Sequence, residues 1–428
     1  MEVESIPPTA RERIERISSA DLMIGVLSDH DGAALVSVRQ ALEKLPQVPR
    51  TVIIQGNGTQ GNGPAELETA ERADAPDAHP ASEDSSVFVV PWALMGPASS
   101  ITPVENMANA YESVLALGDK LGVRAACVLA SDPHTVTPQW VFRLVQPVLQ
   151  LGFDLVTPWY AHGRFEGLLN NSLIAPLTRG LYGARIQNPM GPDLGISRRL
   201  FQGILAAQQG NRGAGNRAHP LASVTTAAIC NGFKICQAHV GARIYPPIDW
   251  TNLSALLVQV LGPVFLDMER NAAHWQRPRE SAFIPSFGER MAVAEDNGAV
   301  DVGRMLELFR LGARDLLEIW SLILPPTILF ELRKLSRLQQ EEFRMADELW
   351  ARSVYDFALA HRLRTISRDH LLRAVTPLYL GWVASYALEM ENASARAAEQ
   401  RFERLGQAFE ANKGYLVSRW RWPDRFNP

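Results

Sequence analysis

The chain has 428 residues, of which 46% are hydrophobic and 21% charged, and its formal net charge is −4. This composition is typical of a folded protein with a large core, long enough for two or three domains. The small negative charge gives no electrostatic reason to expect nucleic acid as a partner.

Neither a signal peptide nor a membrane span is expected. The first residues, MEVESIPPTARERIERI, carry charges and lack an apolar run. Apolar stretches elsewhere are interrupted before they reach the roughly 18 residues that a membrane helix needs. Three scattered cysteines without zinc-type spacing indicate buried free thiols, so the sequence predicts a cytoplasmic protein.

The N-terminal part alternates apolar strands with amphipathic helices. Residues 21–28 (DLMIGVLS) predict a buried strand, residues 33–45 a helix, and residues 50–55 (RTVIIQ) a second strand. Apolar strands joined by a helix favour a parallel sheet that is covered on both faces. The pattern resumes further on with strands at 87–90, 124–130 and 153–157 and helices at 104–122 and 138–151.

Residues 56–86 interrupt this pattern with a stretch rich in Gly, Pro, Asp, Glu and Ser. Its two Gly-Asn-Gly units could hold a phosphate through backbone N–H groups. A mobile surface loop is the preferred interpretation, because no known phosphate-loop spacing is present.

The second half of the chain has a different pattern. Apolar residues spaced by three and four predict long helices at 254–272, 299–323, 326–362 and 368–420. We therefore expect an α/β domain over residues 20–250 and an all-helical domain over residues 251–420.

The stretch VLASDPHTVTPQW, residues 128–140, carries the first chemical signal. A buried strand ends at Asp132, and an amphipathic helix follows. Nucleotide-sugar enzymes place a metal at such a strand end and usually show Asp-x-Asp there. Here the first of the two positions is Ala130, so a single acid remains.

The segment 156–197 is dense in groups that bind small acids. It contains Arg164, Arg179 and Arg185, and the planar guanidinium suits carboxylates and diphosphates because it donates two parallel hydrogen bonds. Asp193 stands in the turn GPDLG, where glycines allow the backbone to approach a ligand closely. For each arginine taken alone, a surface or structural role is an equally good interpretation.

Two blocks, NNSLIAPLTRGLYGARIQNPMGPDLGIS and TTAAICNGFKICQAHVGARI, resemble the glucosylglycerate and mannosylglycerate synthase group of GT-A glycosyltransferases. The resemblance covers residues 20–420 and includes helical stretches such as ELWARSVYDFALAHR. It implies a GT-A domain followed by a helical domain. It also implies retaining transfer of a hexose from UDP-glucose or GDP-mannose to a glycerate-like acid, with Mg²⁺ or Mn²⁺.

Residue by residue, the resemblance implies these roles. Asp193 would be catalytic, lying near the acceptor hydroxyl or the anomeric carbon, and Ser28 and Asp132 would contact the donor. The acceptor's polar end would be held by Arg164, Asn171, Thr178 and Arg179. Helical domains of this sort often supply a dimer surface, so a homodimer is expected by analogy.

Several family positions have changed, and most of them serve the donor and the metal. Where the family has a metal-binding His, this chain has Tyr245. The family's Gly-Ile-Asp is replaced by His219-Pro220-Leu221, and its Gly-Lys-Gly by Thr102-Pro103-Val104. One carboxylate plus water is a weak site for Mg²⁺ or Mn²⁺. His134 could add a ligand for Mn²⁺, although a surface histidine is the simpler interpretation, and an Arg or Lys could replace the ion.

Two hypotheses follow. The first is an active transferase with an altered or absent metal site. The second is a non-catalytic binding or scaffold protein that kept the fold and a pocket, because residues that act as a unit lose their function together.

Overall fold

The computed structural model describes residues 8–56, 86–92, 103–210, 220–244, 252–277, 280–291 and 300–423. The chain divides into two compact units. The first unit comprises residues 1–156 and 192–215, and the second comprises residues 157–191 and 216–428. This division follows spatial contacts, so the second unit takes in segments of the expected α/β region. The boundary expected near residue 250, between an α/β domain and a helical domain, remains a prediction.

The first unit is built on a mostly parallel sheet. Its strands follow the order β7-β4-β1-β2-β3, and β1 pairs in parallel with both β2 and β4. β7 runs antiparallel to β4, so the sheet is mixed. The bounds are β1 Leu22–Val26, β2 Thr51–Gln55, β3 Val87–Pro91, β4 Ala125–Leu129 and β7 Leu194–Ser197.

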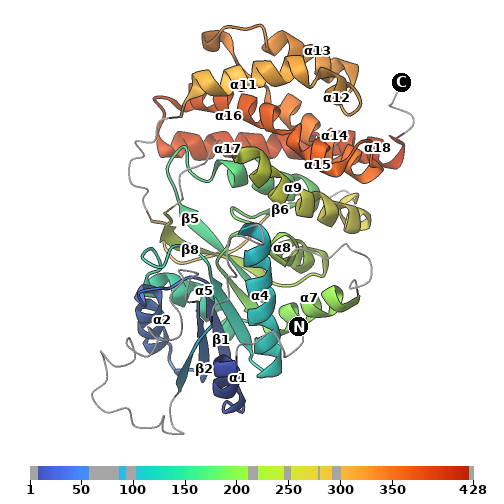
Figure 1. The fold of residues 1–428 in the computed structure, drawn as a ribbon. Coiled ribbons are helices and arrows are strands. Elements are labelled where there is room, and N and C mark those ends of the chain that lie inside the picture. The colour runs from blue at the N-terminus through green and yellow to red at the C-terminus, as the bar shows by residue number, and fades with distance from the viewer. Residues whose placement is uncertain are drawn as a thin grey trace. The chain divides into compact units, whose positions relative to one another are not determined.

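Helices cover both faces of this sheet, as the apolar strands predicted. α2 packs on α5, which packs on β4 and β7, whereas α4 packs on β1, β4 and α7. Figure 1 shows α2 and α5 on one side of the strands and α4 on the other. The bounds are α1 Pro8–Glu15, α2 Ala33–Glu43, α4 Pro103–Lys120, α5 Pro138–Gln150 and α7 Arg198–Gly210. Every residue of β1 and β4 is buried, which explains their continuous apolar sequence.

Strand β5, Leu155–Ala161, crosses the boundary between the units along the chain. Its first two residues pair antiparallel with β7 in the first unit. In the second unit the strand order is β5-β8-β10, with β8 at Ile235–Ala242 and β10 at Ser286–Phe287. The short strands β6, Ala184–Arg185, and β9, Ala282–Phe283, form a separate parallel pair.

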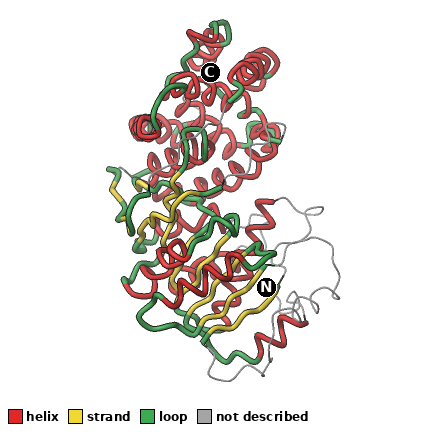
Figure 2. The backbone as a smooth tube through the Cα atoms, turned by 90° about the vertical axis from the view of Figure 1, so that its left-hand side faces the viewer, coloured by secondary structure: helices red, strands yellow, loops and turns green. Residues whose placement is uncertain are grey.

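The remainder of the second unit is helical (Figure 2). A π-helical segment, Asn170–Ile174, leads directly into α6, Ala175–Tyr182. The other helices are α8 Pro220–Cys230, α9 Leu253–Arg270, α10 Ala272–Trp275, α11 Val302–Asp315, α12 Leu317–Ser321, α13 Pro326–Leu335, α14 Asp347–Leu363, α15 Arg368–Arg373, α16 Thr376–Met390, α17 Ala395–Ala411 and α18 Lys413–Arg421.

One core joins these helices, and its largest members are aromatic. Trp350, Trp382, Tyr355, Tyr379 and Tyr386 are all essentially inaccessible to solvent. The indole rings of Trp350 and Trp382 stack with centroids 6.4 Å apart. Burial of such side chains is the main favourable term for the helical region.

The single helix predicted over 326–362 is two helices, and that prediction is wrong. α13 ends at Leu335 and α14 begins at Asp347. The connection buries Phe343 and Met345 in the core, and the Met345 N–H donates to Ser385 Oγ at 2.9 Å. The connecting segment therefore contributes apolar residues to the core without being part of one continuous helix.

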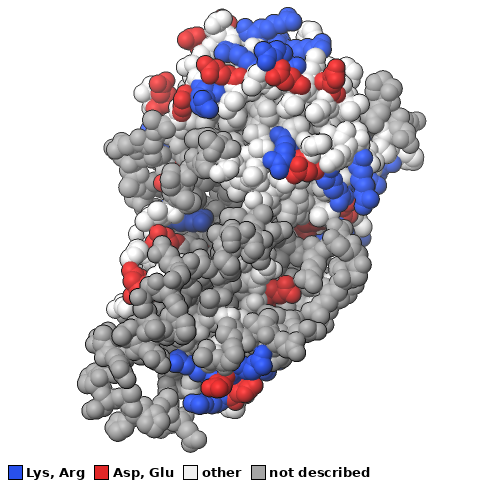
Figure 3. All heavy atoms as spheres, viewed as in Figure 1, with Lys and Arg blue, Asp and Glu red and all other residues white. Residues whose placement is uncertain are grey.

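On the face shown in Figure 3, Lys and Arg are interspersed with Asp and Glu. Several exposed pairs of this kind are close, such as Arg373 with Asp369 at 2.8 Å and Arg352 with Glu348 at 2.5 Å. Within the described ranges, we find no helix with the combination of length and apolar character that crossing a bilayer requires.

Candidate functional site

The first candidate site is the edge of the first unit's sheet where β1 and β4 end. Both strands are parallel, so their carboxyl ends meet at the same edge. The chain leaves β1 toward β2 on one side, while β4 lies on the other side. Such a switch point is where open α/β sheets bind ligands. Ser28 and Asp31 follow β1 here, and Asp132 and His134 follow β4.

Asp29 follows Ser28 at this edge and is completely buried. Its two carboxylate oxygens accept the N–H groups of Ala34 at 3.1 Å and Leu35 at 3.0 Å. These are among the first N–H groups of α2, which have no partner within the helix. Asp29 therefore caps a helix and has little capacity left for a ligand. Ser28 is half-buried, and its Oγ lies 3.5 Å from His30 Nε2.

Asp193, the expected catalytic residue, also accepts hydrogen bonds from backbone N–H groups. It is completely buried, and its Oδ1 accepts the N–H groups of Ala130 at 2.7 Å and Ser131 at 3.0 Å. Its Oδ2 accepts the hydroxyl of Ser131. The carboxylate thus fixes the turn that follows β4, at the position of the altered Asp-x-Asp motif. The geometry describes a positioning residue, and the expected catalytic role of Asp193 stays a prediction.

The metal ligands expected at this edge do not form a metal site. Asp132 Oδ1 accepts the N–H of His134 at 2.9 Å, in a local turn. His134 Nε2 lies 3.2 Å from Asp31 Oδ2, and both side chains are more than half exposed. Within the described ranges, no group of three or more His, Cys, Asp or Glu side chains is arranged to hold an ion. The described groups at this edge therefore do not by themselves make up a divalent-metal site, and we assign no reaction step to a metal.

The four expected acceptor residues all belong to the second unit, but they serve different sites. Arg164 Nη1 donates to three carbonyls at the end of α16, those of Met390, Glu391 and Ala393, at 2.9–3.0 Å. It therefore satisfies carbonyl groups that the helix leaves open. Thr178 lines a small internal gap of about 20 Å³ with Asp267. Only Asn171 and Arg179 reach a larger cavity.

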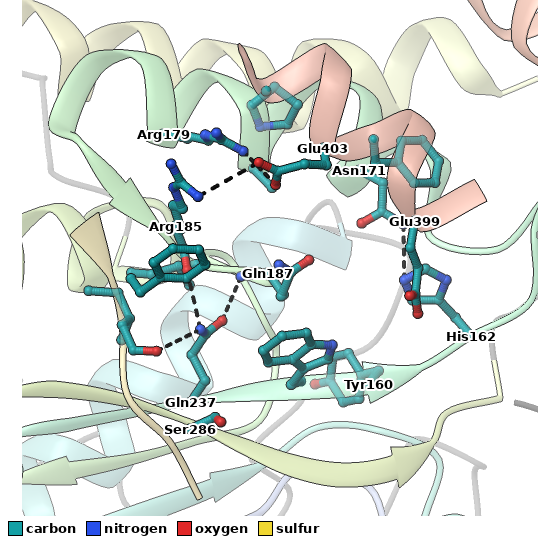
Figure 4. Close-up of a pocket in the computed structure, with 18 of the residues that line it drawn as sticks. Tyr160, His162, Asn171, Arg179, Arg185, Gln187, Gln237, Ser286, Glu399 and Glu403 are labelled. Carbon is teal, nitrogen blue, oxygen red and sulfur yellow. Dashed lines mark hydrogen bonds and ion pairs between the residues drawn. The ribbon is translucent and has the colours of Figure 1, made fainter. Parts of the chain in front are cut away.

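That larger cavity is the second candidate site (Figure 4). Its volume is about 590 Å³, within the range of small-molecule pockets. Residues from eight segments of the second unit line it, and they are Trp159, Tyr160, His162, Asn171, Ala175, Pro176, Arg179, Arg185, Ile186, Gln187, Gln237, Phe283, Ile284, Ser286, Arg290, Glu399, Gln400, Phe402, Glu403 and Gly406. Most are aromatic, amide or charged groups, which suits a ligand with several polar groups.

Arg179 is held between two glutamates. Its Nη1 donates to Glu403 at 2.7 Å, its Nη2 donates to Glu410 at 3.0 Å, and its Nε lies 2.9 Å from Glu410. Burial alone would lower the pKa of Arg179, but hydrogen bonds to Glu410 and Glu403 outweigh burial and raise it. The guanidinium is therefore charged and already neutralised, so its capacity for an incoming carboxylate is small.

Arg185 is not among the predicted acceptor residues, and the structure gives it a more open position than Arg179. It lies on β6, where its Nε donates to Ser281 Oγ at 2.8 Å. Its Nη1 is 3.7 Å from Glu403, well beyond the 2.7–2.9 Å of a charge-assisted hydrogen bond. Its guanidinium lies over the ring of Phe283, 4.3 Å from the centroid. Arg185 therefore retains donor capacity toward the cavity.

Amide groups border the cavity on another side. The π-helical segment brings Asn171 to within 3.1 Å of His162 Nε2, while His162 Nδ1 lies 3.1 Å from the Gly163 carbonyl. This arrangement fits a neutral imidazole with its proton on Nδ1. Asn170 donates to the carbonyl of Gln187 at 2.7 Å. The π-helical turn is the local feature that presents the two asparagines, and such turns are common at functional sites.

Gln237 holds another wall of the cavity in place through hydrogen bonds. Its Oε1 accepts the N–H of Gln187 at 2.7 Å, and its Nε2 donates to the Arg185 carbonyl at 3.2 Å. These contacts tie β8 to the strand that carries Arg185. In Figure 4, Gln187 lies between the arginine side of the cavity and the His162 side, and Gln237 lies below Arg185 and Gln187 in this view. Gln237 is missing from the predicted site because its role depends on contacts about 50 residues away along the chain.

Some expected features lie outside the described residues. These are most of the predicted mobile loop, residues 57–85, together with Thr102, His219 and Tyr245.

Comparison with known proteins gives only distant likenesses. No family model matches the chain, and no curated protein matches it. Among solved structures, a glucosyl-3-phosphoglycerate synthase from Mycobacterium tuberculosis in complex with Mn²⁺, UDP and glucosyl-3-phosphoglycerate is 15% identical, with a TM-score of 0.33 over 62% of this chain and 85% of that chain.

A second structure of that enzyme, with Mn²⁺, UDP-glucose and phosphoglyceric acid, is 14% identical, with a TM-score of 0.34 over 67% of this chain and 92% of the other. A structure described as a mycobacterial protein is 15% identical, with a TM-score of 0.36 over 62% and 79% of the two chains. At these values no residue role is transferred from those proteins to this chain.

Proposed function

We propose that this protein binds a small hydroxylated acid in the cavity of its second unit and is a divergent relative of nucleotide-sugar transferases. The observation that carries the proposal is the open position of Arg185 in a cavity of about 590 Å³ lined by amides and aromatic rings. A guanidinium with spare donors is suited to a carboxylate, and neighbouring amides are suited to hydroxyl groups.

The charge of the first unit's edge gives no support to transfer without a metal. A departing nucleoside diphosphate develops negative charge, which a cation must stabilise. Among the described residues that follow β1 and β4 directly, 27–31 and 130–134, the charged side chains are acidic and no Lys or Arg occurs. An acidic edge without a metal would repel a diphosphate.

A second candidate is the transferase itself, as the family resemblance implies. One specific observation favours it: Asp31 and Asp132 are exposed at the switch-point edge, where α/β sheets bind their ligands. In this candidate a hexose would pass from UDP-glucose or GDP-mannose to an acid, with retention of configuration. A cation supplied by the protein would have to replace the metal.

Calorimetric titration separates the two candidates. The purified chain would be titrated with D-glycerate and D-glucuronate as acids, and with UDP-glucose, GDP-mannose, UDP and GDP, each with and without Mn²⁺. The binding proposal expects heat on titration with at least one acid. It also expects that Mn²⁺ does not increase the affinity for any of the nucleotides. A ligand present at about 100 times its Kd should add about 2.7 kcal/mol to the stability of the folded state.

The outcomes differ clearly. Nucleotide binding that appears only with Mn²⁺ would favour the transferase, and product formation from a nucleotide sugar and an acid would establish it. A folded sample that binds neither acid would overturn the proposed function.

A further inference from the structure

The size of the second unit's cavity bears on the class of acid that it binds. A water molecule takes up about 30 Å³, so 590 Å³ corresponds to about 20 water-sized positions. A three-carbon hydroxy acid has about half as many non-hydrogen atoms as a hexuronic acid, so it fills about half as much of the cavity. A three-carbon acid would leave most of the cavity to water.

The charged end of a ligand has one favourable position. Arg179 already contacts Glu403 and Glu410 through three of its nitrogens. Arg290 is paired with Glu399. Arg185 donates from Nε to Ser281, and its contact with the Glu403 carboxylate is longer, at 3.7 Å, so a ligand carboxylate beside its Nη groups would break the fewest existing ion pairs.

The hydroxyl-binding groups lie away from Arg185. In Figure 4, Arg179, Arg185 and Glu403 lie on one side of the cavity, and His162 and Glu399 lie on the other, with Gln187 between them. A ligand that contacts both sides must therefore extend across the cavity. A ring with hydroxyl groups along its edge does so, whereas a three-carbon acid reaches only one side.

Aromatic rings supply apolar surface between these polar groups. Trp159 lines the cavity and packs on His239 with centroids 4.4 Å apart, which fixes its indole ring. Phe283 lines the cavity beneath Arg185 and is 81% exposed. The C–H faces of a pyranose ring are apolar and suit such rings, while its edge is polar.

We propose that the cavity binds a pyranose ring that carries a carboxylate, a hexuronic-type acid, with the carboxylate on Arg185 and hydroxyl groups toward Asn171 on the other side of the cavity. This inference rests on the proposed function and names the ligand class of the same site. A neutral hexose would leave Arg185 without its ligand partner, and a three-carbon acid would leave the aromatic surface uncovered.

Titration of the full chain with three probes tests the proposal. We expect D-glucuronate to bind at least about tenfold more tightly than D-glucose or D-glycerate, because only it satisfies both ends of the cavity. The Arg185→Gln variant should lose about tenfold or more for D-glucuronate and be unchanged for D-glucose. Arg185→Lys should recover part of the loss, since it restores the charge but not the planar fork.

Arg314→Gln is the matched control, because Arg314 is an exposed arginine paired with its neighbour Asp315 outside the cavity. It should leave all three affinities unchanged. D-glucuronamide provides a test on the unaltered protein, since it removes the charge from the ligand instead. It should bind about as weakly as D-glucose.

Two results would overturn the inference while leaving the proposed function in place. One is D-glycerate binding as tightly as D-glucuronate. The other is D-glucuronamide binding as tightly as D-glucuronate, which would show that the cavity does not recognise the carboxylate. Failure of both acids to bind would instead remove the proposed function itself.

Discussion

Buried carboxylates do different work in the two units. In the first unit, Asp29 and Asp193 accept hydrogen bonds mainly from backbone N–H groups at the strand edge. In the second unit, the half-buried Asp347 forms two hydrogen bonds of 2.7 Å with Arg401, and the buried Asp356 lies 2.8 Å from Arg419. The first arrangement shapes a loop, whereas the second joins helices that are distant in sequence.

The comparison shows why an acid at a strand end is weak support for catalysis. An acid that is fully engaged by neighbouring N–H groups has little capacity for substrate or metal. In the second unit, by contrast, the three arginines that line the cavity differ in how fully they are paired, and the least paired of them, Arg185, marks the candidate site. Four substitutions test this contrast, and they are described in order of expected effect.

The largest effect is expected for Asp356→Ala. Asp356 is 1% exposed and Arg419 is 5% exposed, so the variant leaves a buried guanidinium without its anion. The hydroxyl of Tyr415 also loses its 2.8 Å contact with Asp356. Removing one partner of a buried pair costs about 3–5 kcal/mol. Hydrogen exchange of α14 and α18 should reveal this loss as faster exchange in both helices.

Asp315→Ala serves as the control for this prediction, because the Arg314–Asp315 pair is exposed. Exposed pairs are screened by solvent and contribute little to stability, so exchange in the core helices should not change. Equal effects of the two variants would contradict a structural role for the buried pair.

Asp193→Ala should have the next largest effect. It leaves two buried N–H groups and the Ser131 hydroxyl without their acceptor, at a cost of about 3 kcal/mol. Amides of β4 and of the following turn should exchange faster. The neighbouring exposed residue gives the control, since Asp132→Ala removes only one local turn contact. If Asp193→Ala instead kept the exchange of the wild type and abolished sugar transfer, the catalytic role would be supported.

Asp267 gives a pH-dependent contrast within the second unit. Burial is the main cause that raises the pKa of this carboxyl from 3.8 to about 6, although hydrogen bonds from Thr226 and others oppose it. Between about pH 4 and 6, Asp267 is therefore protonated in the folded state and ionised in the unfolded state. The stabilisation is present below about pH 4 and is lost as the pH rises through about 6.

The expected size is roughly 2–3 kcal/mol, because each pKa unit corresponds to about 1.4 kcal/mol. Asp267→Asn should flatten this part of the pH profile for unfolding of the second unit, monitored by exchange in α9. Asp301→Asn, at the exposed N-cap of α11, is the control and should keep the profile of the wild type. A difference in stability between the wild type and Asp267→Asn that stays constant between pH 4 and 6 would contradict the assignment.

Much of the fold could be predicted from the sequence, because the patterns that encode it are local. The continuous apolar runs of β1 and β4 predicted a covered parallel sheet, and the structure confirms a mixed α/β architecture. The GT-A assignment remains a prediction. The break between α13 and α14 was missed, because the connecting segment also carries apolar residues, Phe343 and Met345, that pack in the core outside both helices.

The candidate site was less predictable, because the partners of its residues are far away in sequence. Arg179 was expected to bind an acceptor, but its charge is taken by Glu403 and Glu410, more than 220 residues along the chain. Arg164 was given the same role, but it donates to the end of α16. The residue type correctly predicted that these arginines donate hydrogen bonds to oxygen acceptors. It could not predict that the acceptors are groups of the protein itself, which leaves few donors for a ligand.

The smallest effect is expected for His134→Ala, and it tests the remaining metal hypothesis. His134 is 65% exposed and meets Asp31, 54% exposed, at 3.2 Å. An exposed pair of this kind adds about 0–1 kcal/mol, and less at high salt. The melting temperature should therefore stay close to that of the wild type, and added Mn²⁺ should shift neither protein. A metal site built on Asp132 and His134 would instead give a Mn²⁺-dependent stabilisation in the wild type that His134→Ala and Asp132→Ala both remove, whereas His30→Ala, at the same edge, would keep it.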